Sequence, residues 1–158
     1  MEDADVEAAP RLTTTNYDGV MAEHHTAEIL AAFRADVSPD AFREQMTWKR
    51  FWVVEGGGEI VAVGALADFG EPGAPNHVVS QFYVRADRHR RGIGRLLLAH
   101  LTGIARADAA ERLHVPSSRN AVPFYEDAGF TVDDAQPDAA VEMTWMTLPL
   151  AESPPAPG

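Results

Sequence analysis

The stretch QFYVRADRHRRGIGRLLL (residues 81–98) decides most of what the sequence predicts about this chain. A β-type segment runs into an arginine-rich loop, and Gly92 and Gly94 stand where a segment with helical periodicity begins. The first turn of a helix has N–H groups without intrahelical partners and the positive end of the helix dipole, so it favours an anion. Glycine has no Cβ, which lets a phosphate approach the backbone, and arginines add charge-assisted donors. The stretch therefore predicts a loop that holds a diphosphate.

Two familiar phosphate-binding fingerprints do not fit this loop. The pattern G-x-G-x-x-G fails because Leu97 stands three residues after Gly94. The pattern G-x-x-x-x-G-K-[ST] fails because the only lysine, Lys49, lies far from any such loop. A solvated arginine surface before a glycine-started helix remains the alternative, since a basic cluster alone is weak evidence for a site.

The charge of the chain is unevenly distributed. The 158 residues include 13 Lys+Arg and 24 Asp+Glu, a formal net charge of −11, yet residues 85–95 contain five arginines and one aspartate. The rest of the chain has 8 basic and 23 acidic groups, so a local charge of +4 interrupts a charge of −15. An acidic chain is a poor candidate for binding nucleic acid or an anionic membrane. The absence of cysteine excludes a disulfide scaffold, a Cys-ligated zinc site and thiol catalysis.

Length and composition predict one globular domain. The hydrophobic content of 46% is close to the globular norm, and the sequence contains no repeat at solenoid periods. We expect a flexible N-terminus at 1–10, a folded domain at 11–149 and a disordered Pro-rich tail at 150–158. The first residues do not resemble a signal peptide, and no apolar run approaches the roughly 18 residues of a membrane span, so we expect a cytoplasmic protein.

Helical and strand periodicities alternate along the folded region. Ser38 as N-cap and Pro39 at the first helical position predict the start of one helix, and Gly129 predicts the end of another. The predicted helices are 20–35, 38–46, 93–107 and 120–128, and the predicted strands are 51–55, 59–66, 77–84, 113–115, 130–132 and 141–148. This alternation predicts an α+β or α/β domain with a mixed sheet.

Two segments resemble motifs of the GNAT superfamily of acyl-CoA-dependent N-acyltransferases. The loop HRRGIG (89–94) is similar to the family's pyrophosphate loop, [QR]-x-x-G-x-[GA], and it stands between a strand end and a helix as in that family. The segment SSRNAVPFYEDAGF (117–130) resembles the family's FYxxxGF segment, and the resemblance covers most of residues 20–148. It implies a single GNAT-like domain with a central mixed, largely antiparallel sheet of about six to seven strands, flanked by about four helices.

The resemblance also implies a cofactor and the residues that hold it. Acetyl-CoA would be the acetyl donor, with no metal. The strand at 77–84 would splay from its neighbour, and the pantetheine arm would bond, like an added strand, to backbone groups of Phe82, Tyr83 and Val84. Such main-chain contact is compatible with core packing of the Phe82 and Val84 side chains. The loop residues that would hold the pyrophosphate are His89, Arg90, Arg91, Gly92, Ile93, Gly94 and Arg95.

One residue of the second motif has an implied chemical role. Tyr125 matches the family's tyrosine, which donates a proton to the departing CoA thiolate; a phenol with a pKa of about 10 can serve a thiolate of about 8.5 when it lies close to the sulfur. The alternative is a buried aromatic residue that packs against Phe124 and Phe130. The family often has Asn seven residues before this tyrosine; here Ser118 stands there and Asn120 follows two places later, and either could contact the cofactor.

The chain departs from the family pattern at positions that bear on catalysis. His89 stands where Gln or Arg is usual, and it can contact phosphate with a charge that varies near neutral pH. The segment at 113–115 lacks the glutamate that some N-terminal amine acetyltransferases use as a base, which argues against protein N-terminal acetylation. The candidates for the general base are His77, Glu71, His114 or water.

We interpret the chain as an N-acetyltransferase that transfers an acetyl group from acetyl-CoA to a primary amine of a small molecule. Direct attack is expected, since no cysteine is present to form an acyl-enzyme. The acceptor would enter near 20–46 and the 70–75 loop, where Trp48 and Trp52 either line the entrance or pack in the hairpin. Six acidic residues and no basic ones at 126–142 either attract a cationic amine or form a solvated face.

Two other functions are weighed against this interpretation. A non-catalytic acyl-CoA-binding or sensing module would keep the loop and lack turnover. A nucleic-acid-binding protein conflicts with the charge of −15 outside the arginine cluster. We therefore expect a small-molecule amine as the partner, neither nucleic acid nor a membrane, and a homodimer, as the family often forms.

Overall fold

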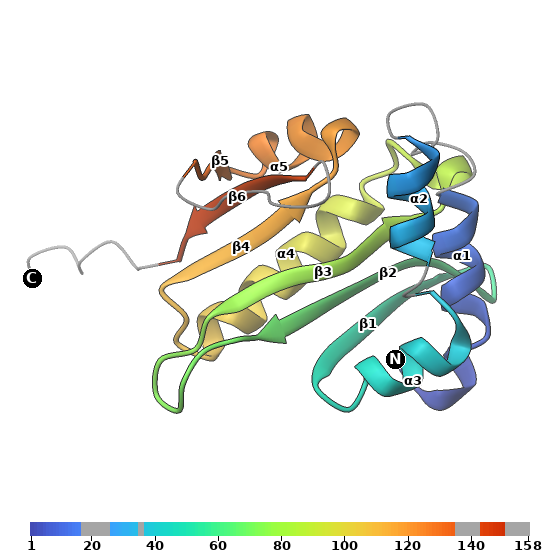
Figure 1. The fold of residues 1–158 in the computed structure, drawn as a ribbon, viewed down its shortest axis with the longest axis horizontal. Coiled ribbons are helices and arrows are strands. Elements are labelled where there is room, and N and C mark those ends of the chain that lie inside the picture. The colour runs from blue at the N-terminus through green and yellow to red at the C-terminus, as the bar shows by residue number, and fades with distance from the viewer. Residues whose placement is uncertain (17–25, 35–36, 135–142, 151–158) are drawn as a thin grey trace, which may run out of the picture.

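The computed structural model describes residues 1–16, 26–34, 37–134 and 143–150. The strands form one six-stranded sheet in the order β1-β2-β3-β4-β6-β5 (Figure 1). Within the described residues the helices are α1 (Ala8–Asn16), α2 (Ala27–Arg34), α3 (Pro39–Gln45), α4 (Ile93–Ala107) and α5 (Val122–Asp127), and the strands are β1 (Lys49–Gly56), β2 (Glu59–Asp68), β3 (His77–Val84), β4 (Arg112–Ser117), β5 (Thr131–Val132) and β6 (Thr144–Pro149).

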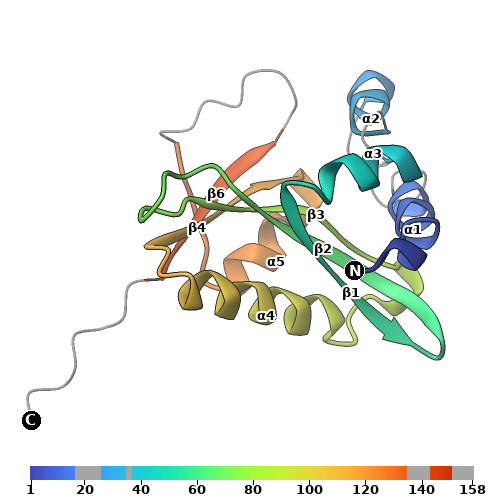
Figure 2. The ribbon, with the colours of Figure 1, turned by 90° about the horizontal axis from the view of Figure 1, so that it is seen from below.

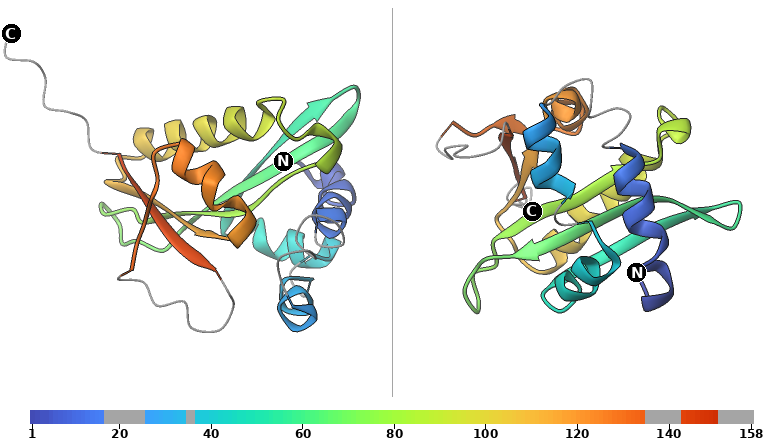
Figure 3. Two further views of the ribbon diagram at one scale, coloured as in Figure 1. Left: turned by 90° about the horizontal axis from the view of Figure 1, so that it is seen from above. Right: turned by 45° about the vertical axis from the view of Figure 1, so that its right-hand side comes forward.

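The sheet is mixed and mostly antiparallel, with helices on both faces. β3 and β4 are parallel, whereas the other neighbouring strands pair antiparallel. The long helix α4 crosses one face of the sheet, and α1, α2 and α3 gather on the other (Figures 2 and 3). The predicted α+β fold with a largely antiparallel mixed sheet is therefore confirmed. The described residues contain five helices rather than about four, because a helix precedes the first predicted one.

Each face of the sheet has its own hydrophobic core. On one face, Leu97 and Leu101 lie one turn apart on α4 and pack, fully buried, toward Val79 of β3. On the other face, the rings of Phe42 from α3 and Phe51 from β1 lie 5.4 Å apart in a second core. Strand β2 lies beneath both cores and is buried at every residue from 61 to 67, which explains its continuous apolar run.

The N-terminal residues 1–10, expected as a flexible segment, pack against the sheet. Residues 3–5 form a 3-10 turn and α1 follows, with Val6 and Ala9 completely buried in the second core. The N-terminal ammonium of Met1 donates a hydrogen bond to the carbonyl of Phe51 at 2.9 Å. The apolar side chains that anchor this segment are few and small.

The other end of the predicted domain also extends slightly. Leu150 is buried, and its N–H donates to the carbonyl of Glu111 at 2.8 Å, so the packed chain reaches one residue beyond the predicted boundary at 149. Of the tail predicted at 150–158, residues 151–158 lie outside the described residues. Of the helix predicted at 20–35, residues 20–25 and 35 also lie outside the described residues, and Ala27–Arg34 form α2. Residues 141 and 142 of the strand predicted at 141–148 lie outside them as well.

Local signals in the sequence set several element boundaries. The Ser38 hydroxyl accepts a hydrogen bond from the N–H of Ala41 at 3.0 Å, and Pro39 is the first residue of α3, as predicted. The turn between β1 and β2 needs left-handed backbone at Gly57 and Gly58, with φ of 62° and 80°. The helix predicted at 120–128 is confirmed as a 3-10 turn followed by α5, and Gly129 ends it with φ of 97°.

Strands β3 and β4 separate after a short paired segment, as the resemblance implied. Their ladder contains only the pairs His77–Leu113 and Val78–His114. Further along β3, a bulge interrupts its register with β2 opposite Gly64, and Gln81 takes a left-handed φ of 48° there. A bulge bends its strand and increases the local twist, so the last residues of β3 turn away from β4. The divergence opens the sheet where β3 leads into the arginine-rich loop.

Candidate active site

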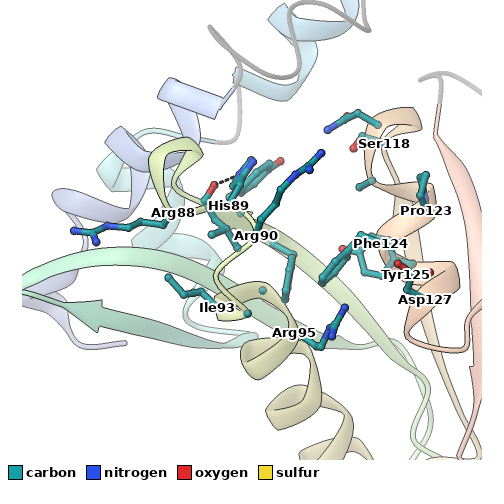
Figure 4. Close-up of a pocket in the computed structure, with 17 residues that line it drawn as sticks. Arg88, His89, Arg90, Ile93, Arg95, Ser118, Pro123, Phe124, Tyr125 and Asp127 are labelled. Atoms are coloured by element: carbon teal, nitrogen blue, oxygen red, sulfur yellow. Dashed lines mark hydrogen bonds between the residues drawn. The ribbon is translucent and has the colours of Figure 1, made fainter.

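A cavity of about 770 Å³ lies where β3 and β4 diverge. Its walls come from the end of β3, the arginine-rich loop, the first turn of α4, and α5 with the turn before it (Figure 4). The residues that line it are Phe82, Tyr83, Val84, Arg88, His89, Arg90, Gly92, Ile93, Gly94, Arg95, Ser118, Asn120, Ala121, Pro123, Phe124, Tyr125 and Asp127.

The cavity brings together almost all of the residues predicted for the site. Of the thirteen predicted, only Arg91 is missing from the lining, and it lies exposed in the loop between Arg90 and Gly92. The lining residues that the prediction missed are Arg88, Ala121, Pro123, Phe124 and Asp127. Arg88 belongs to the arginine cluster and the other four lie within or beside the FYxxxGF segment, so proximity in the sequence was the available signal.

The loop backbone is shaped so that a helix N-terminus faces the cavity. Arg90 and Gly92 both have left-handed φ, at 62° and 80°, and Gly92 is the N-cap of α4. The amides of the first helical turn have no intrahelical acceptors and point out of the helix end. At Gly94 a Cβ would lie 3.3 Å from the side chains of both Phe124 and Val84, which is tighter than ordinary contact. A side chain at position 94 would therefore press against both walls of the cavity.

The arginines of the cluster divide into two groups. Arg85 is neutralised: its Nη1 lies 2.8 Å from Glu59 and its Nε 2.6 Å from Asp87, and hydrogen bonds to these two carboxylates raise the pKa of Arg85. Within the described residues no carboxylate forms an ion pair with Arg90 or Arg95. Figure 4 shows Arg90 extending toward Ser118 and Arg95 toward Phe124, whereas Arg88 extends away from α5. The cationic side chains at the cavity are therefore fewer than the sequence suggested.

His89 ties the loop to the end of β3. Its Nε2 lies 2.8 Å from the carbonyl oxygen of Val84, and because that oxygen can only accept, Nε2 is the donor (Figure 4). The imidazole thus fixes the loop against the strand from which the cavity opens. This tie gives a structural account of the residue that departs from the usual Gln or Arg.

Tyr125 belongs both to the hydrophobic core and to the lining of the cavity. The two interpretations from the sequence, a proton donor and a buried aromatic residue, are therefore compatible. It is 4% exposed, and its ring centre lies 5.1 Å from that of Phe124, 5.5 Å from Phe130 and 6.1 Å from Phe82. Burial raises the pKa of its phenol well above the usual value, and the nearby Tyr83 adds to the shift. The phenol therefore stays protonated and able to donate.

Ser118 and Asn120 both line the cavity. The Oδ1 of Asn120 is buried and has no partner among the described residues. The carbonyl of Ser118, by contrast, already accepts from the Ser117 hydroxyl at 2.8 Å and from the Ala121 N–H at 3.1 Å. An unpartnered buried acceptor that faces a cavity fits an N–H donor of a bound molecule.

The three side chains considered as general bases all lie away from the cavity lining. His77 is buried at the other end of β3, where its Nε2 lies 2.8 Å from Asp108, which also contacts Arg50. The Nδ1 of His114 lies 3.0 Å from the hydroxyl of Thr147. Glu71 is exposed in the turn between β2 and β3.

The residues expected at the acceptor entrance are also separated from the cavity. The loop at 70–75 joins the end of β2 to the start of β3, and the cavity lies at the opposite end of β3. Trp48 is half exposed and its ring lies 6.0 Å from that of Phe69, while Trp52 packs against His100 on the α4 face. Of the acidic residues at 126–142, Asp127 lines the cavity, and 135–142 lie outside the described residues.

Among the described residues no group of three or more His, Cys, Asp or Glu side chains is arranged to hold a metal ion. None of the helices described is long and apolar enough to cross a membrane.

Comparison with known proteins agrees with this geometry. A family model described as "Acetyltransferase (GNAT) domain" matches residues 18–150, and the chain belongs to this family. Comparison with curated protein sequences gave no match.

Solved structures with the same fold cover nearly the whole chain. The PaiA N-acetyltransferase of Thermoplasma acidophilum, in complex with coenzyme A, has a TM-score of 0.77 and 14% identity, covering 94% of this chain and 95% of that one. A GCN5-related N-acetyltransferase of Rhodopseudomonas palustris has a TM-score of 0.79 and 19% identity, covering 94% and 92%. An aminoglycoside 6'-N-acetyltransferase complexed with coenzyme A has a TM-score of 0.66 and 11% identity, covering 92% of each chain.

The chain is thus an acetyltransferase, and the cavity fits acetyl-CoA as the donor. Three observations of this structure support the fit: the open amides at the start of α4, the absence of a side chain at Gly94, and the unpartnered Oδ1 of Asn120. The arginines that face the cavity suit the phosphates of such a molecule, and the buried aromatic wall suits its apolar arm.

Proposed function

We propose that this acetyltransferase transfers the acetyl group of acetyl-CoA to a primary amine of a small molecule by direct attack. One observation carries the proposal: a single cavity contains both the amide-rich start of α4 and Tyr125, which come from segments about thirty residues apart. An anion site and a protonated phenol in one cavity are what a diphosphate-linked thiol leaving group requires.

Backbone groups would hold acetyl-CoA both at its pantetheine arm and at its pyrophosphate. The cavity-lining residues of β3, Phe82 to Val84, lie beyond the ladder with β4 and would pair with the amides of the pantetheine arm. The amides of Gly92 to Arg95, with the side chains of Arg90 and Arg95, would bind the pyrophosphate. Between Ser118 and Asn120, we assign the pantetheine contact to Asn120, because its Oδ1 is the unpartnered acceptor.

The chemistry assigned to this chain is a single proton transfer. The amine nitrogen bonds to the acetyl carbon and the C–S bond breaks, so the sulfur leaves as a thiolate that needs a proton. Tyr125 would donate it, since its phenol is neutral and borders the cavity. An amine that enters as the ammonium cation loses two protons on becoming an amide, and we assign both to water because the candidate bases lie elsewhere. One of the two returns to the Tyr125 phenolate, so the net reaction releases one proton. No cysteine is present to accept the acetyl group first.

The acceptor we propose is a cationic amine at neutral pH. Asp127 lines the cavity beside Tyr125, and Glu126 is exposed next to it, so this wall has a negative potential that attracts cations. One of the similar structures is an aminoglycoside acetyltransferase, and we therefore include a polycationic sugar among the test amines.

The test is release of free thiol from acetyl-CoA with spermidine, kanamycin, phenethylamine or L-lysine as acceptor. We expect at least one amine to be acetylated, and Tyr125→Phe to lower kcat while the thermal shift induced by CoA stays unchanged. A thermal shift with CoA but no thiol release with any of the four amines would contradict the proposal and favour the non-catalytic sensing module.

A further inference from the structure

A polar cluster on the α3 side of the sheet lies outside the lining of the cavity. It consists of Gln45 at the end of α3, Lys49 at the start of β1, and Ser80 and Gln81 of β3. Lys49 Nζ donates to Gln45 Oε1 at 2.7 Å and to the Ser80 hydroxyl at 3.0 Å, and Gln81 Nε2 donates to the same Gln45 Oε1 at 3.3 Å. Gln45 itself is buried.

The hydrogen bonds fix which way the amide of Gln81 points. The ammonium of Lys49 can only donate, so the Gln45 atom that it contacts must be the oxygen. The Gln81 atom that contacts this oxygen must then be the nitrogen, because two amide oxygens would repel. The contact of Lys49 with Gln45 therefore sets the orientation of both amides, and Oε1 of Gln81 points away from Gln45.

This oxygen is left without a donor. Gln81 Oε1 is buried and has no hydrogen-bond partner among the described residues. A buried acceptor without a partner is unfavourable, and native proteins satisfy nearly all such groups. A hydrogen-bond donor is therefore expected at this oxygen, either an internal water molecule or an N–H group of a bound ligand.

Gln81 directly precedes the first residue of β3 that lines the cavity. Gln81 is the bulge residue with φ of 48°, a conformation that residues other than glycine seldom adopt. The bulge directs Gln81 toward α3, whereas the next residue, Phe82, lines the cavity with its ring 6.1 Å from that of Tyr125. Unusual backbone held by surrounding contacts is typical of functional positions.

We propose that Gln81 Oε1 accepts a hydrogen bond from the amine of the acceptor substrate and holds it for attack from the α3 side of the sheet. This role rests on the proposed function, since it assumes an amine acceptor. A carboxamide suits the task better than a carboxylate, because a negative charge would stabilise the ammonium form and oppose the loss of its proton. Gln45 and Lys49 act as positioning residues that orient the amide.

The variant that tests this is Gln81→Met, which keeps the length of the side chain and removes the acceptor. The matched control is Ser80→Ala, which removes one hydrogen bond of Lys49 from the neighbouring position and leaves Gln81 intact. Steady-state kinetics are measured for both with the best of the four amines named above. We expect Gln81→Met to lower kcat/KM for the amine about tenfold, mainly through KM, with KM for acetyl-CoA unchanged. Ser80→Ala should match the wild type in both constants.

The outcomes separate this proposal from the one on which it rests. If the wild type acetylates an amine and Gln81→Met has the same kcat/KM, an internal water satisfies Gln81 and only this proposal is overturned. An equal loss in Gln81→Met and Ser80→Ala would also overturn it, because it would show a structural effect of the cluster. If the wild type acetylates none of the four amines, the proposed function fails and this proposal fails with it.

Discussion

Replacing Gly64 by alanine tests how closely β2, β3 and α4 pack beside the cavity. A Cβ at this position would lie 3.1 Å from Leu97 Cδ2, 3.1 Å from Phe82 Cδ2 and 3.2 Å from Leu101 Cδ1. All three neighbours must move, and overpacking of this kind costs about 1–3 kcal/mol. Removing a glycine from a strand returns about 0.5–1 kcal/mol. The net loss in the free energy of unfolding then lies between about 0 and 2.5 kcal/mol, and because three side chains must move at once we expect about 1–2 kcal/mol.

Gly103 provides the matched control, because the same substitution there should have the opposite sign. It is exposed in the interior of α4, and a Cβ at this position would have no atom within 4 Å. Alanine in a helix interior is more favourable than glycine by about 1 kcal/mol, so Gly103→Ala should stabilise the protein.

Thermal unfolding with and without CoA measures both effects. For a domain of this size, 1 kcal/mol shifts Tm by about 2–4 °C, so we expect Gly64→Ala to lower Tm by about 2–8 °C and Gly103→Ala to raise it by about 2–4 °C. Because Phe82 lines the cavity, Gly64→Ala should also reduce the additional Tm shift that CoA induces. A Tm for Gly64→Ala equal to or above that of the wild type would refute the reasoning about close packing.

Three further predictions concern the site and its supports. Tyr125→Phe should lower kcat by about 10²-fold or more while the CoA-induced Tm shift is retained; an unchanged kcat would remove Tyr125 from the chemistry. Gly92→Glu should abolish the CoA-induced shift, whereas Gly92→Gln, with the same backbone strain at φ of 80° but no charge, should keep part of it; equal losses would argue against an anion site. The N–H groups of Asn76 and Gly70 donate to Asp68 and hold the pKa of its carboxyl below the usual value, so its contribution to stability is present above about pH 4 and is lost as pH falls through the folded pKa. Asp68→Ala should therefore lower Tm at pH 7, and the difference from the wild type should shrink in acid; a difference independent of pH would contradict this.

The parts of the fold that could be predicted from the sequence depend on residues close together in the chain. The start of α3 needs only Ser38 and Pro39, and the loop before α4 needs only its glycines and the strand end before it. The FYxxxGF segment could be placed at the same cavity because the resemblance supplied the long-range relation. Almost the entire predicted lining follows from these two short segments.

The features that could not be predicted depend on contacts between distant residues. Arg85 counts as a cation in the sequence, but Glu59, on another strand, neutralises it. The left-handed backbone at Gln81 has no local signal, because the bulge is imposed by pairing with β2. His77 lay in a strand that was predicted correctly, yet its direction toward Asp108 depends on where α4 ends.

The short ladder between β3 and β4 has a consequence for how far acceptor specificity can be inferred from this fold. Two residue pairs join the two halves of the sheet, so the spacing of the cavity walls is set by the packing of α4 and α5 against them. The hydrogen-bond pattern of the sheet can then stay constant while a few side chains at that packing alter the width of the opening. Divergent sequences would thereby keep one architecture and one donor while exchanging the molecule that they acetylate.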